Sequence, residues 1–87
     1  MSEVSTNSNT VSSIGEYRVG IDFNPSGNEA VHDIKTKAAA LIDAMEALKT
    51  ASLNVSPEVI RLAALAQTAF EEGAMWAVKA ITKEPRR

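Results

Sequence analysis

The amino-acid sequence predicts an all-α fold, a two-helix antiparallel hairpin with an extended N-terminal arm, assembled into a compact homo-oligomer. Alanine fills fourteen of the 87 positions whereas aromatic residues supply 5%, a composition typical of thin, closely packed helices. Two long stretches, about residues 27–50 and 57–83, carry apolar residues at helical spacing, and each begins with a helix-capping pattern. A chain of this length forms one domain at most.

The N-terminal segment is polar at first and then weakly amphipathic. Residues 1–14 are rich in Ser, Thr and Asn and lack the basic start and apolar run of a secretory signal, so we expect a flexible arm ahead of a single domain at residues 15–87. From Tyr17 to Phe23 apolar side chains alternate, which predicts an extended strap over an apolar surface. No run approaches the roughly 18 apolar residues of a membrane span, and we expect a cytoplasmic protein.

The first predicted helix, about residues 27–50, begins just after a proline. Ser26 is placed to cap it, Glu29 is placed to complete a capping box, and Pro25 disfavours helical geometry in the residue before it. Apolar residues then recur at alternating spacings of three and four, as in a coiled seam. They are Val31, Ile34, Ala38, Leu41, Met45 and Leu48.

The second predicted helix, about residues 57–83, has equally clear limits. Ser56 provides an N-cap, Pro57 suits the first helical position, and Glu58 favours the positive end of the helix dipole. The predicted seam consists mostly of small residues: Val59, Leu62, Ala66, Ala69, Gly73, Trp76 and Ala80. Outside it lies a second apolar surface, made of Ile60, Leu65, Phe70, Met75, Val78 and Ile81.

That second surface predicts self-association. Two helices cover one stripe of each other, so a leftover apolar face of this length needs another copy of the chain against it. Ordering about 60 residues costs roughly 90 kcal/mol, at about 1.5 kcal/mol per residue, and a bare hairpin is not expected to recover that free energy.

Composition excludes several kinds of chemistry. The chain has no cysteine and a single histidine, His32, so neither a thiolate zinc site nor a histidine cluster is available. The adjacent acids Glu71 and Glu72 are typical of a solvated helix face. A net charge of −2 provides no positive field for a long nucleic acid. We therefore expect a protein that is not an enzyme and that uses no cofactor and no metal.

One segment carries the features of an anion site. Backbone amides at the start of the first helix, together with the Ser26 hydroxyl, suit a phosphate, and Lys35 and Lys37 follow on the same helix. Aromatic rings at Tyr17 and Phe23 are available to stack on a base. In the alternative interpretation Ser26 only caps and the lysines are solvated. In a two-fold dimer these groups appear twice about the axis, which matches a ligand with two phosphates and two bases, such as a cyclic dinucleotide.

Longer runs of the sequence resemble a known family. They are Arg18-Val19-Gly20-Ile21-Asp22-Phe23-Asn24-Pro25-Ser26 and Met75-Trp76-Ala77-Val78-Lys79-Ala80, with Arg61 and Ala64-Leu65-Ala66-Gln67-Thr68 between them. Over roughly residues 17–83 the chain is similar to the small helical-hairpin domain of phage anti-CBASS and anti-Thoeris sponge proteins. The resemblance implies a sponge that sequesters cyclic di- and trinucleotide messengers, such as 3′,3′-cyclic GMP-AMP, so that host CBASS immunity is not activated.

The resemblance also implies an assembly and a set of binding residues. It predicts a hexamer, a trimer of dimers, in the host bacterial cytoplasm, with dinucleotides held between protomers and trinucleotides in separate pockets. Either Tyr17 or Phe23 is the stacking ring, and either Lys35 or Lys37 is the phosphate cation. The expected dinucleotide site contains Tyr17, Phe23, Asn24, Ser26, Lys35 and Lys37, with the backbone around Gly27, and the trinucleotide pocket contains Arg61. Trp76 is expected in the core.

Two alternative functions stay open. The leftover apolar face suits a helical interaction module that blocks a host defence protein. Anti-Thoeris relatives capture cyclic ADP-ribose type signals, and the shared hairpin does not exclude these ligands. A phosphodiesterase is disfavoured because the chain lacks a metal-ligand cluster.

Overall fold

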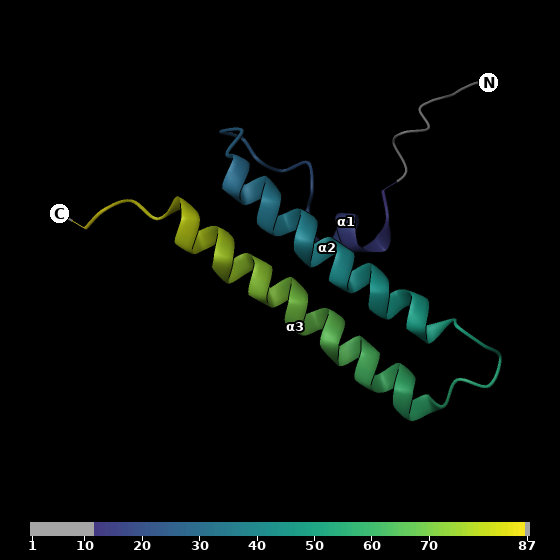
Figure 1. The fold of residues 1–87 in the computed structure, drawn as a ribbon. Helices are drawn as coiled ribbons and strands as arrows, with labels where there is room; N and C mark the ends of the chain where they lie inside the picture. Colours follow the sequence, from purple (N-terminus) through teal and green to yellow (C-terminus); the bar gives the residue numbers. More distant parts are fainter. Residues whose placement is uncertain (1–11, 87) are drawn as a thin grey trace, which may run out of the picture.

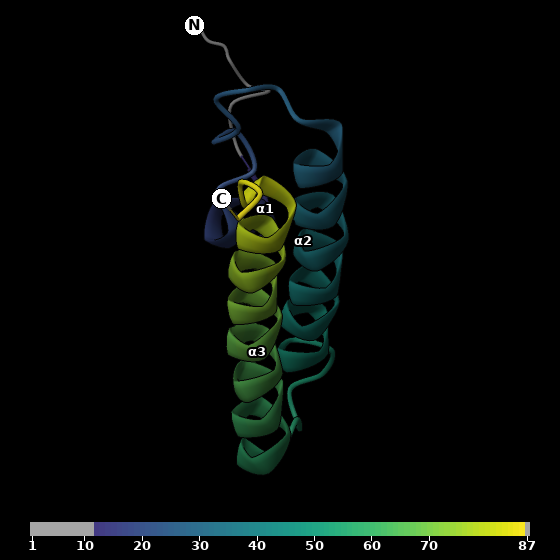
Figure 2. The ribbon, with the colours of Figure 1, turned by 90° about the vertical axis from the view of Figure 1, so that its left-hand side faces the viewer.

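The computed structural model of the protein describes residues 12–86 and contains three helices in that range (Figure 1). Helix α1 spans Ile14–Val19, α2 spans Glu29–Lys49 and α3 spans Pro57–Thr82. Helices α2 and α3 form an antiparallel hairpin, and α1 lies against one side of it (Figures 1 and 2). The all-α prediction and the hairpin are confirmed. Residues 1–11 of the predicted flexible arm lie outside the described residues.

The predicted extended strap is wrong, because α1 forms in its place. Ser13 caps this helix: its Oγ accepts a hydrogen bond from the Glu16 amide at 3.0 Å, and Glu16 Oε1 accepts one from the Ser13 amide at 3.0 Å. Gly20 ends the helix with a φ of 66°, a left-handed conformation that suits glycine. These local bonds outweigh the weak alternation of apolar side chains in the sequence.

The start of α2 also differs from the prediction. Asn28, and not Ser26, is the N-cap, since Asn28 Oδ1 accepts hydrogen bonds from the amides of Ala30 at 2.8 Å and Val31 at 3.1 Å. Ser26 lies in the preceding turn, so the predicted capping box with Glu29 does not form. The first-turn amides that the sequence offered to a phosphate therefore already have an acceptor.

The start of α3 is confirmed as predicted. Ser56 Oγ accepts a hydrogen bond from the Val59 amide at 3.2 Å, and Pro57 occupies the first turn. The pattern is local to the chain, which is why the sequence alone identifies it.

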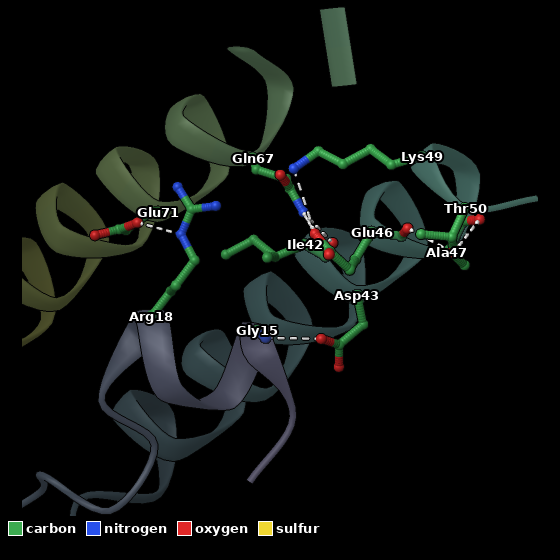
Figure 3. A network of polar contacts seen from close by, with 10 residues as sticks. All are labelled: Gly15, Arg18, Ile42, Asp43, Glu46, Ala47, Lys49, Thr50, Gln67 and Glu71. Carbon is green, nitrogen blue, oxygen red and sulfur yellow. Dashed lines mark hydrogen bonds and ion pairs between the residues drawn. The ribbon is translucent and has the colours of Figure 1, made fainter. Parts of the chain in front are cut away.

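Helix α1 approaches the α2 backbone closely because Gly15 has no side chain. The Gly15 amide donates a hydrogen bond to Asp43 Oδ1 at 2.7 Å (Figure 3). A Cβ atom at this position would lie 2.1 Å from the carbonyl oxygen of Ala39, far inside van der Waals contact. Gly15 is the buried residue of α1.

The core is small and consists mainly of alanine. Its buried apolar residues are Val31, Ala38, Ala39, Ile42, Ala63 and Ala74. Of the predicted α2 seam, Val31 and Ala38 are buried, but Leu41 and Leu48 are 48% and 43% exposed. The buried stripe of α2 is rotated toward Ala39 because α1 covers that side of the helix.

The seam predicted for α3 is wrong. Leu62 and Trp76 are 51% and 62% exposed, so Trp76 does not lie in the core of the chain. Helix α3 instead buries Ala63, Gln67 and Ala74. The spacing of apolar residues in the sequence does not reveal Gln67, the polar side chain at the centre of the interface between α2 and α3.

A polar network joins α2 to α3 at that centre (Figure 3). Gln67 is fully buried, and its Nε2 donates to the Ile42 carbonyl oxygen at 3.1 Å and to Glu46 Oε1 at 3.0 Å. Gln67 Oε1 has no hydrogen-bond partner among residues 12–86. The bond from Gln67, and next the bond from Lys49 at 3.3 Å, hold the pKa of Glu46 below its usual value.

An apolar surface remains on the side of the hairpin away from α1, and we call it the open face. A groove of about 220 Å³ between α2 and α3 forms its centre, and Leu41 and Gly73 are among the residues that line it. Other members follow at helical spacing along the two helices. The open face consists of Ile34, Leu41, Leu48, Leu62, Ala69, Gly73 and Trp76. The Cα atoms span only 12 Å in the thinnest direction, so the chain presents a thin layer of helices.

The contact at Gly15 leads to a first prediction. In Gly15→Ala the added methyl group meets the Ala39 carbonyl, so α1 has to move away from α2, and we expect a loss of roughly 1–3 kcal/mol in the free energy of unfolding. Urea unfolding measures that loss, and hydrogen exchange of the α1 amides measures the detachment. Thr36→Ala is the control, because Thr36 is exposed on α2 and lies outside the open face. If the α1 amides exchange hydrogen at the same rate in Gly15→Ala and in the unmodified protein, the prediction is contradicted.

Candidate ligand-binding site

Tyr17 and Phe23 lie on one shallow groove of about 330 Å³. Their side chains are 76% and 73% exposed, so both rings are open to solvent. The groove is lined by Ser12, Glu16, Tyr17, Gly20, Ile21, Asp22 and Phe23. The fold therefore places the two rings on the same surface, and both remain candidates for stacking on a base.

Lys35 is buried beneath this segment and is only 6% exposed. Its Nζ donates hydrogen bonds to the carbonyl oxygens of Gly20 at 2.9 Å and Phe23 at 2.5 Å. The same nitrogen lies 5.5 Å from the centroid of the Phe23 ring, within the range of a cation–π interaction. Two of its three N–H donors thus hold the loop that carries Phe23.

Lys37 lies elsewhere on α2. It forms an exposed ion pair with Asp33 at 2.9 Å and lines the groove at the centre of the open face. Lys35 and Lys37 therefore lie on different sides of the helix and are not brought together within one chain.

The loop before α2 is held by its own side chains. Asn24 Nδ2 donates to the Asn28 carbonyl oxygen at 2.7 Å, and Asn24 Oδ1 accepts from the Asn28 amide at 3.1 Å. Ser26 is exposed in the turn, and Gly27 has a φ of 64°. In this chain Asn24 shapes the loop, while Ser26 is open to solvent.

Arg61 lies near the start of α3, and it lines neither the aromatic groove nor the groove that contains Lys37. Its Nε and Nη2 donate to the two carboxylate oxygens of Glu58 at 3.0 Å and 2.6 Å. These bonds lower the pKa of Glu58 and raise that of Arg61. A role in a separate trinucleotide pocket stays a prediction.

A second pocket, which sequence reasoning missed, lies between α1 and α3. Its volume is about 230 Å³, and its lining residues are Arg18, Val19, Lys35, Glu71, Ala74, Met75 and Val78. Arg18 Nε donates to Glu71 Oε1 at 2.7 Å across it (Figure 3). Arg18 stands in the longest run of the family resemblance, but nothing in the sequence links it to Glu71, 53 residues away.

The described range contains neither a cluster of metal-ligating side chains nor a membrane-spanning helix. Within residues 12–86 no group of three His, Cys, Asp or Glu side chains is placed to hold a metal ion. None of the three helices in that range has the length and apolar character needed to cross a membrane.

Comparison with known proteins identifies the family. The family model described as Acb2/Tad1, hairpin domain, matches residues 16–82, so the chain belongs to this anti-CBASS and anti-Thoeris sponge family. The resemblance drawn from the sequence is confirmed. The family consists of non-catalytic domains that bind cyclic nucleotide signals. No curated protein and no solved structure matches the chain.

The different environments of the two lysines lead to a second prediction. Lys35→Met keeps the apolar stem but leaves the Gly20 and Phe23 carbonyls without their donor, and we expect a loss of roughly 1–3 kcal/mol in the free energy of unfolding. Lys37→Gln breaks an exposed ion pair and keeps a polar side chain at the open-face groove, so it should change the free energy of unfolding by less than about 0.5 kcal/mol. Urea unfolding of both variants at pH 7 checks the difference. Similar losses in both contradict it.

Proposed function

We propose that the protein is a sponge that sequesters cyclic di- and trinucleotide messengers, such as 3′,3′-cyclic GMP-AMP, and thereby prevents activation of host CBASS immunity. One observation supports the choice of nucleotide ligands: Tyr17 and Phe23 expose their rings on one groove, and the buried ammonium group of Lys35 lies 5.5 Å from the centroid of the Phe23 ring. Family membership adds that the domain binds cyclic nucleotide signals without transforming them.

The groove supplies the kind of contact that a nucleobase needs. A base stacked on an aromatic ring contributes about 1–3 kcal/mol, whereas nanomolar binding requires about 12 kcal/mol. A groove of about 330 Å³ is at the lower end of small-molecule sites, which occupy roughly 300–1,000 Å³. A single chain therefore offers part of a site, and the rings of a second chain about a two-fold axis would provide the second base with the same contacts.

The open face supports the proposed assembly into a homo-oligomer, with a hexamer built as a trimer of dimers as the expected form. Its large apolar side chains are half exposed in the single chain, and the buried core beneath them is mostly alanine. Helical domains normally bury such a face against a second layer. The open face of a second copy of the chain would form that second layer, with its own apolar side chains packed against those of the first copy.

The open face also supports the alternative function of an interaction module that blocks a host protein, since an apolar face of this size suits a foreign helix as well as a second copy. In that case the rings at Tyr17 and Phe23 have no ligand. A sponge for cyclic ADP-ribose type signals uses the same rings and is distinguished only by ligand choice.

Binding without turnover is the third prediction. Isothermal titration with 3′,3′-cyclic GMP-AMP should give tight binding, and chromatography of the released ligand should return it intact. A parallel titration with a cyclic ADP-ribose isomer tests the related ligand class. Recovery of a linear dinucleotide contradicts the sponge, and the absence of any nucleotide response together with a specifically retained host protein favours the interaction module.

The fourth prediction concerns the assembly. Leu41 lines the centre of the open face and is 48% exposed, so Leu41→Glu should disturb a single chain little but place a charge inside the proposed interface. Native mass spectrometry should show an oligomer, with a hexamer expected, for the unmodified protein and a shift to smaller species for the variant. Thr36→Glu, on an exposed position of the same helix outside the open face, is the control. An unmodified protein that is monomeric at micromolar concentration contradicts the assembly.

A further inference from the structure

The pocket between α1 and α3 contains more positive than negative charge. Two cationic side chains, Arg18 and Lys35, line it together with one carboxylate, Glu71. Arg18 uses Nε for its bond to Glu71, while its terminal nitrogens, Nη1 and Nη2, make no hydrogen bond to any of residues 12–86 (Figure 3). A guanidinium group has five N–H donors, so residues 12–86 engage one donor of Arg18 and leave the other four without a partner in that range.

Both cations are largely removed from water. The Arg18 side chain is 24% exposed and Lys35 is 6% exposed. A partly buried charge is stabilised by further hydrogen bonds to groups of opposite charge. The other acids near α1 have partners of their own, since Asp43 accepts from the Gly15 amide and Glu46 accepts from Gln67 and Lys49. The pocket is therefore suited to an additional anion.

The shape of the pocket indicates which anion. Its remaining walls are apolar, formed by Val19, Ala74, Met75 and Val78. Its volume of about 230 Å³ is too small for a whole cyclic dinucleotide but suits a part of one. A phosphodiester next to a sugar combines an anionic group with an apolar surface, and planar guanidinium groups bind phosphate oxygens in a bidentate manner.

Lys35 connects this pocket to the aromatic groove. Lys35 is one of the lining residues of the pocket, and its ammonium group bonds to the Phe23 carbonyl and lies 5.5 Å from the centroid of the Phe23 ring. A base on that ring and a phosphate beside Arg18 are thus separated by a single side chain. Lys37, in contrast, lines the groove at the centre of the open face.

We propose that Arg18 is a phosphate-binding residue of the ligand site, with Lys35 as the second cation of the pocket and Glu71 as the carboxylate that holds the guanidinium group in place through Nε. This inference rests on the proposed function, since it names the residue that would receive a phosphate of the cyclic nucleotide. In the bound state the phosphate oxygens accept hydrogen bonds from Nη1 and Nη2, and Nε keeps its bond to Glu71.

The charges of the Arg18–Glu71 pair provide the test, which is the fifth prediction. Arg18→Gln removes the phosphate donor, and affinity for 3′,3′-cyclic GMP-AMP should fall about tenfold or more, with a shallower dependence on salt. Glu71→Gln breaks the same ion pair, but it also removes a carboxylate that repels phosphate. Affinity for 3′,3′-cyclic GMP-AMP should therefore rise in this variant. Lys83→Gln removes one positive charge outside the pocket and is the matched control. Isothermal titration measures affinity, and urea unfolding measures the stability that both pocket variants lose with the ion pair.

Opposite effects of Arg18→Gln and Glu71→Gln on affinity support the assignment. Weaker binding in both variants overturns it, because the pair is then only a tether between α1 and α3. Unchanged binding in Arg18→Gln also overturns it while leaving the sponge intact. If the unmodified protein binds no cyclic dinucleotide, the proposed function fails as well, and the two failures are thereby distinguished.

Discussion

The contact between the Gly15 backbone and α2 determines where the candidate site residues lie. A helix of six residues such as α1 is too short to be stable by itself, so its position depends on what holds it. Gly15 lets the backbones meet and donates to Asp43. Arg18 follows three residues later on the same helix face, toward the hairpin, while Tyr17 points to another side. Docking at a single glycine therefore directs a guanidinium group inward and an aromatic ring outward.

Thinness is the second constraint on this chain. Alanines allow α2 and α3 to approach each other, but each contributes little buried apolar area, and Ile42 is the largest apolar side chain that is fully buried. Larger apolar side chains such as Leu41 and Leu62 lie about half exposed on the open face, and Met75 lines the pocket between α1 and α3. A fold of this kind leaves apolar surface exposed, where other molecules can bind it. The small core makes the single chain less stable, and the exposed surface suits the chain to assembly.

The features that the sequence predicted are those encoded by residues close together in the chain. The Ser56–Pro57 start of α3 depends on neighbouring residues and is confirmed. The two predicted rings, six residues apart, also share a groove. Near α2 the prediction of Ser26 as the cap is wrong, because the turn before the helix places the Asn28 side chain, two residues later, against the first amides.

The features that the sequence missed depend on tertiary contacts. The buried stripe of α2 is rotated because α1 packs beside Ala39, and that packing is invisible in an apolar repeat. The Arg18–Glu71 pair joins residues 53 positions apart. In the sequence Glu71 is one of two adjacent acids typical of a solvated helix face. Its partner, Arg18, lies on α1 and is near Glu71 only because α1 packs against the hairpin.

The buried amide of Gln67 has a consequence for the alignment of the two helices. Where alanines recur at successive turns, sliding one helix along the other by a turn of about 5.4 Å replaces small side chains by similar ones, and the alternative registers differ little in packing energy. Gln67 makes one register more stable than the others. Its Nε2 donates to the Ile42 carbonyl and to Glu46 in this alignment, and in an alignment shifted by one turn it would lose both hydrogen-bond partners. A side chain that lines neither the aromatic groove nor the pocket between α1 and α3 thus selects the register in which Glu71, one turn further along α3, stands opposite Arg18.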